Sequence, residues 1–189
     1  HQIKREAIYG DDTFLEEERM LFRSRVVDVL IDNTFKKTKI YPDYEEHTRQ
    51  LARHLLHAGS ETKYTNKECF RHAAQIEEAY RNFPRCLRYY RAYLDAIENS
   101  QQYVNKASVS LALAKVLKVQ GLFDEAQTEL YNSEMFLISS KKIKEERNER
   151  KTLIKRILVE KGALLAIQKE YEKSNAVLYR ARILLEGRF

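Results

Sequence analysis

The stretch LALAKVLKVQGLFDEAQTEL, residues 111–130, decides the fold. Ala114 lies nine positions before Phe123, Ala126 lies three positions after it, and the large apolar Leu130 lies seven after it. The small residues allow two neighbouring helices to approach closely. The turn that joins these helices is expected at Gly121, because a glycine can end a helix without a side-chain clash. The aromatic ring is expected to fill the wedge at the turn, and Leu130 to reach the next pair of helices.

The same pattern recurs on both sides of this stretch. Its members are Ala74, Phe83, Cys86 and Tyr90 in one copy, and Gly162, Tyr171, Ser174 and Leu178 in the other, with Ala181 as a further small residue. A weaker copy lies around Tyr41. The four aromatic residues are 42, 40 and 48 positions apart. A helical hairpin of this kind cannot bury its apolar face alone, so the repeat predicts hairpins that stack on one another.

Composition favours helices throughout. The 189 residues include only 5 glycines and 2 prolines, too few for a sheet rich in tight turns or for a glycine-rich phosphate loop. Charged residues make up 33% of the chain, against about 25% in a typical domain. Capping residues and apolar spacings of three and four predict eight helices and no strand. The expected helices are residues 13–32, 43–58, 65–80, 84–97, 106–119, 123–138, 144–168 and 172–186.

The repeat resembles the tetratricopeptide repeat family. Residues Leu113, Ala114, Gly121, Phe123 and Ala126 match the best-kept positions of that family, and Gly162, Leu165, Tyr171 and Ala181 match nearly as well. The spacing of 40 or more exceeds the usual 34 residues, which resembles the longer-helix variants of the family or a related helical-hairpin solenoid. The sequence also departs from the family pattern in lacking the usual proline after Ser133. The resemblance covers about two thirds of the chain.

The resemblance implies an all-α, right-handed superhelix of about four antiparallel hairpins. These hairpins are expected at residues 13–59, 65–99, 106–138 and 144–186, within a single helical-repeat domain over 1–189. Because the chain begins at His1, we expect it to be a fragment of a longer protein. An irregular helical bundle with chance spacing is the alternative.

A tetratricopeptide superhelix presents a concave groove that binds a peptide or a helix. By register, the groove residues are expected to be Arg71, Gln75, Ser108, Leu111, Lys115, Arg156 and Val159. The Lys/Asn/Arg clamp with which some members of the family bind a chaperone tail is missing. A mixed, mildly basic groove would suit an acidic or amphipathic segment of a partner protein. The competing interpretation is that these side chains are merely solvated.

The excess positive charge lies in the second half of the chain. Residues 1–100 carry 17 basic and 17 acidic side chains, and residues 101–189 carry 17 and 11. The basic segment 141–156 contains Lys141, Lys142, Lys144, Arg147, Arg150, Lys151 and Lys155. It is either the solvated start of a helix or a docking patch for nucleic acid or another acidic surface. Nucleic-acid binding would weaken steeply with salt, and the segment has no aromatic residue for base stacking.

No catalytic centre and no cofactor motif is recognisable. His54, His57, Cys69 and His72 could form a zinc site only if four ligands converged, and a metal-free arrangement is the more usual outcome. No apolar run reaches the roughly 18 residues of a membrane helix, and two cysteines fit a reduced, intracellular protein of the cytoplasm or nucleus. The sequence therefore predicts a non-catalytic adaptor or scaffold within a larger protein complex. A structural spacer without a ligand of its own is a further alternative.

Overall fold

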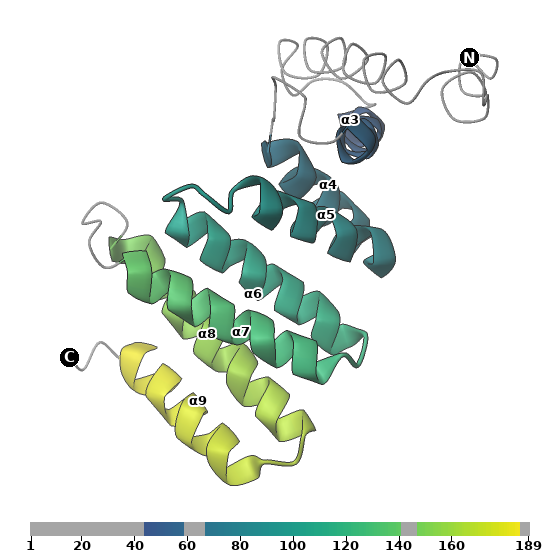
Figure 1. Ribbon diagram of the computed structural model, residues 1–189. Helices are drawn as coiled ribbons and strands as arrows, with labels where there is room; N and C mark the ends of the chain where they lie inside the picture. The colour runs from purple at the N-terminus through teal and green to yellow at the C-terminus, as the bar shows by residue number, and fades with distance from the viewer. Residues whose placement is uncertain (1–43, 59–66, 141–146, 186–189) are drawn as a thin grey trace, which may run out of the picture. The chain divides into compact units, whose positions relative to one another are not determined.

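The computed structural model describes residues 44–58, 67–140 and 147–185, and within them it contains seven helices and no strand (Figure 1). The chain divides into two compact units, His1–Arg81 and Asn82–Phe189. The first unit holds α3 (Tyr44–Ala58) and α4 (Lys67–Ala79). The second holds α5 (Phe83–Ala96), α6 (Tyr103–Val119), α7 (Phe123–Ser139), α8 (Arg147–Ile167) and α9 (Tyr171–Leu185). The all-α class is thereby confirmed for these residues, and the expected helix 13–32 lies outside them.

In the first unit, α3 packs against α4 through an apolar contact and a polar contact. The buried side chains include Leu51, Leu55, Cys69, Phe70 and Ala73. The Cys69 thiol donates to the carbonyl of Thr48 over 3.5 Å, and burial raises its pKa to about 12. Cys69 is therefore a packing residue with little thiolate at neutral pH.

Arg49 provides the polar contact between α3 and α4. Its guanidinium lies 4.3 Å from the centre of the Tyr80 ring, and its Nε lies 3.5 Å from Oε1 of Glu77. The Tyr80 hydroxyl donates to Glu45 over 2.9 Å. Because the Glu77 side chain is almost fully buried, this cation also compensates a charge inside the unit.

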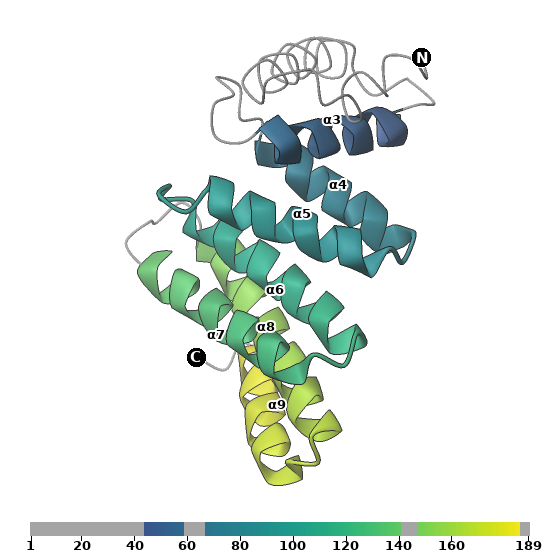
Figure 2. The same ribbon diagram turned by 45° about the vertical axis from the view of Figure 1, so that its right-hand side comes forward.

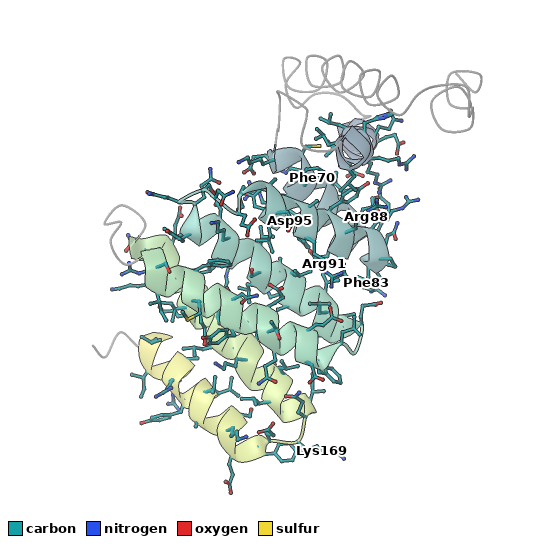
Figure 3. All side chains as sticks on the ribbon, viewed as in Figure 1. Phe70, Phe83, Arg88, Arg91, Asp95 and Lys169 are labelled. Atoms are coloured by element: carbon teal, nitrogen blue, oxygen red, sulfur yellow. The ribbon has the colours of Figure 1, made fainter. Side chains whose placement is uncertain are left out.

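In the second unit, consecutive helices pack against one another, and α8 contacts both α6 and α7 (Figures 1 and 2). The largest fully buried side chains here are Tyr90, Tyr93, Ile97, Leu113, Val116, Leu117, Ile157 and Leu164. Arg91 lies on α5 (Figure 3) and donates to the Glu125 carboxylate of α7 over 2.8 Å. The core thus runs along the interfaces between successive helices.

The small residues of the repeat lie in the core, as their spacing predicted. Ala74 and Ala126 are fully buried, Ala114 and Ala181 are 2% exposed, and Gly162 is buried. A small volume at these positions permits close approach of the two helices of a pair. The Ser174 hydroxyl on α9 donates to the Gly162 carbonyl on α8 over 2.8 Å, which shows how near the two backbones come.

The aromatic residues follow the prediction only in part. Phe83, Phe123 and Tyr171 each stand at the first position of a helix, which places them at the turn as expected. Phe83 and Phe123 are half-buried, but Tyr171 is 61% exposed. The expectation that Tyr171 fills the wedge at its turn is wrong, because most of its side chain is exposed to solvent.

The three short turns that precede these aromatics share a left-handed residue. Arg81, Gly121 and Lys169 have φ values of 56°, 76° and 64°. At two of the turns the next N–H bonds back five residues, from Leu122 to the Leu117 carbonyl and from Glu170 to the Leu165 carbonyl. This is the Schellman termination, in which glycine is the favoured left-handed residue. Sequence alone identified only Gly121 as such a residue.

Replacing Lys169 with glycine is expected to stabilise the protein. The Lys169 side chain is exposed at the α8–α9 turn (Figure 3). Its backbone is in the left-handed conformation, which is unfavourable for a residue with a Cβ. We expect a gain of about 0.5–1 kcal/mol in the free energy of unfolding after the entropy of glycine is counted. Urea denaturation followed by circular dichroism measures this gain.

The control for this prediction is Gly121→Ala. A Cβ at Gly121 would meet no atom within 4 Å, so the substitution tests backbone conformation alone and should cost about 1 kcal/mol. A loss of stability in Lys169→Gly would contradict the assignment of strain to this turn.

Candidate protein-binding face

The middle of α8 is tied to the second half of α6 by a charged cluster. Glu160 on α8 accepts from Lys118 Nζ over 2.5 Å, and Lys115 Nζ lies 3.6 Å from its other carboxylate oxygen. One carboxylate therefore faces two ammonium groups, which leaves the cluster with net positive charge.

Helical spacing from Lys115 on α6, and from residues next to Glu160 on α8, defines a set of residues called the α6–α8 face below. Its members are Ser108, Ala112, Lys115 and Val119 on α6, and Arg156, Val159, Ala163 and Ile167 on α8. Three large apolar side chains in it are exposed to solvent: Val119 by 62%, Val159 by 43% and Ile167 by 50%. Arg156 is also exposed. The α6–α8 face thus combines apolar side chains with an excess of cations.

The predicted groove residues fall into three groups. Ser108, Lys115, Arg156 and Val159 belong to the α6–α8 face. Leu111 does not, because it is only 3% exposed and contributes to the core. Arg71 and Gln75 lie on α4 in the other compact unit, where Arg71 is paired with Glu68 at 2.6 Å and Gln75 is exposed.

Sequence reasoning missed four residues of this region. Val119 lies four positions after Lys115, and Ile167 lies four positions after Ala163, so each shares a helix face with the earlier residue. Helical spacing alone could therefore have identified both. Lys118 and Glu160 come together across two helices, and no local spacing pairs residues that are 42 positions apart. Their contact follows from packing.

The basic segment is only partly within the described residues. Lys141, Lys142 and Lys144 lie outside them, and Arg147 begins α8. Arg150 Nη1 donates to the Ser140 carbonyl over 3.4 Å, Lys151 is exposed, and Lys155 is half-buried. Arg150 is therefore partly engaged in holding the end of α7 near the start of α8.

Lys106 is a buried cation that the sequence did not reveal. It was expected as the first residue of a helix, but α6 begins at Tyr103, and Lys106 is only 6% exposed. Its Nζ donates to the carbonyls of Glu98 and Ser100 over 2.6 and 2.7 Å, and it lies 5.5 Å from the Tyr103 ring centre. Burial lowers the pKa of Lys106, and the nearby Glu98 carboxylate opposes that shift. These two hydrogen bonds tie the loop between α5 and α6 to the first turns of α6.

In the described part of the chain, no three histidine, cysteine or acidic side chains are placed to hold a metal ion. None of its helices combines the length and the apolar character needed to cross a membrane. Cys69 and Cys86 are both buried free thiols.

In comparisons with known proteins, no family model, curated protein or solved structure matches the chain.

Proposed function

We propose that this protein is a non-catalytic adaptor or scaffold that binds a peptide or helix of a partner protein on the α6–α8 face, within a larger complex. The exposure of Val119, Val159 and Ile167 beside Lys115 and Arg156 carries this proposal. Exposed apolar side chains gathered on one surface and flanked by charges are typical of sites that bind other proteins.

The charges of this face suggest the kind of segment it binds. Lys115 and Arg156 belong to the face. Together with the neighbouring Lys118 they outnumber Glu160, the carboxylate that Lys115 and Lys118 contact, so a segment with carboxylates would gain from pairing. Apolar side chains of the same segment would cover the valine and isoleucine side chains. An acidic, amphipathic peptide or helix meets both requirements.

The tetratricopeptide-like, superhelical arrangement is part of the same proposal. Three turns with a left-handed residue at equivalent repeat positions support it, as do the buried small residues of the repeat. The packing of α8 on both α6 and α7 is also the arrangement expected of stacked hairpins. We place such an adaptor inside the cell, in the cytoplasm or nucleus, and we assign it no cofactor.

The proposal is tested by affinity capture with the full chain and with Val159→Asp/Ile167→Asp. Both substitutions put a carboxylate on the apolar part of the face and next to its cations. We expect at least one protein to be captured by the unchanged chain and its recovery to fall about tenfold or more with the variant. Quantitative mass spectrometry of the captured proteins gives the ratio.

The matched control is Tyr131→Asp/Ile138→Asp on α7. These residues are 58% and 52% exposed and lie outside the α6–α8 face, so the control introduces the same charges elsewhere. Circular dichroism must show that both variants fold. Equal loss of captured proteins in both variants, or in neither, would count against the α6–α8 face as the binding site.

A further inference from the structure

The outward side of α7 carries three large apolar side chains in successive turns. Tyr131, Met135 and Ile138 follow one another at spacings of four and three, so they share one side of the helix. They are 58%, 41% and 52% exposed, whereas Leu130 and Leu137 on the opposite side are buried. Single exposed apolar residues are common, but several gathered together are typical of a site that binds another protein. These three exposed residues define the α7 face.

The same positions on α5 carry charged side chains. The 40-residue register places Arg91 at the position of Tyr131, and Asp95 at the position of Met135. Both charged residues are exposed on α5 (Figure 3), as is expected of the solvated side of a helix. The repeat therefore does not require apolar residues at these positions. Such side chains gain free energy when another protein covers them.

Carboxylates flank the α7 face, and α7 itself has no basic residue. The carboxylates of the helix are Asp124, Glu125, Glu129 and Glu134. Arg91 on α5 is paired with Glu125 at 2.8 Å, and Lys161 on α8 is paired with Glu134 at 3.0 Å. Asp124 lies two turns before the α7 face on the same side of the helix, and no cation within the described part of the chain is paired with it. Four carboxylates and two neighbouring cations leave this region with net negative charge.

We propose that the α7 face binds a basic, amphipathic helix of a partner protein, as a second binding site in addition to the α6–α8 face. Apolar side chains of this helix cover the three residues of the face. Its lysine or arginine side chains lie beside Asp124 and the other carboxylates of α7. The proposal does not rest on the α6–α8 face, because the two faces share no residue and select segments of opposite charge.

The charge of α7 argues against a symmetric dimer as the occupant. A symmetric contact uses the same patch on both molecules, so it would place the α7 helices of two copies against each other. Four carboxylates of one copy would then lie opposite four of the other, and neither α7 supplies a basic residue. Such contact between like charges is unfavourable. A partner with basic side chains is the better match.

The probe is a fluorescent peptide of about 20 residues, which is long enough to form a helix. It carries leucines along one side and lysines and alanines elsewhere, and it is called the basic peptide below. The acidic peptide has glutamate in place of every lysine. Because the protein has a net charge of +6, general electrostatic attraction favours the acidic peptide. Binding of the basic peptide therefore requires a local site of opposite charge, and we expect it to bind.

Fluorescence anisotropy with two variants of the full chain tests the apolar part of the site. Tyr131→Ser/Ile138→Ser should weaken the basic peptide about tenfold or more, because it removes most of the apolar surface that the peptide covers. The matched Val159→Ser/Ile167→Ser, on the α6–α8 face, should leave the basic peptide unchanged. Circular dichroism must show that both variants fold.

A second pair of variants tests the charge of the site. Asp124→Asn should weaken the basic peptide about two- to fourfold, because it removes an exposed carboxylate beside the α7 face. The matched control is Glu172→Gln, since Glu172 is the exposed carboxylate at the same position of α9, 48 residues later. We expect Glu172→Gln to have no effect. Equal weakening by both variants would contradict pairing at the α7 face.

Three further results would overturn the proposal. One is that the basic peptide does not bind the full chain. Another is that Tyr131→Ser/Ile138→Ser binds it unchanged, which would place the peptide elsewhere. The last is a dimer in sedimentation equilibrium that the same variant abolishes, which would assign the face to a second copy. In the capture experiment above, proteins lost only with Tyr131→Asp/Ile138→Asp are counted separately, since they report on the α7 face rather than on the α6–α8 face.

Discussion

Replacing Gly162 with leucine is expected to cost about 3 kcal/mol in the free energy of unfolding, the largest effect we predict for a single substitution in the α8–α9 pair. A Cβ at Gly162 would lie 2.6 Å from both Cγ and Cδ2 of Leu178. The two helices cannot simply move apart, because Ser174 on α9 holds the Gly162 carbonyl by a buried hydrogen bond. Differential scanning calorimetry should show Tm lowered by roughly 6–12 °C.

Alanine at Gly162 provides the sharper test, because two effects of known origin oppose each other. Alanine is favoured over glycine inside a helix by about 1 kcal/mol, whereas the Leu178 side chain opposes any Cβ at this position. We expect Gly162→Ala to lower stability in the unchanged chain and to raise it in a Leu178→Ala background. A gain of stability in both backgrounds would contradict close approach of α8 and α9 at this point.

Replacing Lys106 with methionine is expected to cost about 1–2 kcal/mol, although methionine is apolar and similar in length. The change leaves the Glu98 and Ser100 carbonyls without the donor that ties the α5–α6 loop to α6. The cost is limited because the buried ammonium is itself unfavourable, as its lowered pKa indicates. Urea denaturation gives the change in stability. Hydrogen exchange should show the added opening confined to residues 97–102.

The pH dependence of stability separates Lys106 from other lysines. The pKa of Lys106 is lower in the folded than in the unfolded state, so the unfolded chain binds more protons between the two values. The contribution of Lys106 to stability therefore rises with pH in the alkaline range below about 10.5. Lys106→Met should lose this rise, whereas the exposed Lys151→Met should keep it. Identical pH profiles for the two variants would refute the assignment.

Much of the helical architecture could be predicted from local pattern. Apolar spacing and capping residues placed every described helix within a few residues of its observed bounds. The positions of Ala114, Ala126 and Gly162 in the core also followed from sequence, because a small residue at a fixed distance from a turn has a geometric consequence. The candidate face was predicted in outline, through Lys115, Arg156 and Val159.

Other properties were decided by helices that meet only in three dimensions. Leu111 shares a stripe with Lys115, yet it is buried, because exposure depends on what packs against a residue rather than on its spacing. Lys169 adopts a left-handed conformation that its residue type does not favour, because the turn between two packed helices requires it. Neither outcome is encoded within a single helix.

The sequence by itself determined that the described chain is helical and where its helices come closest, since periodicity and side-chain volume act over a few residues. Tertiary structure alone decided which charges meet and which apolar side chains stay uncovered. Lys118 reaches Glu160, and Lys106 reaches the loop before α6, through packing. Leu130 is covered while Leu178 is exposed, although both occupy the same place in the repeat. The physical reason is that the burial and the ion pairing of a side chain depend on the residues around it, and these residues come together only when the chain folds.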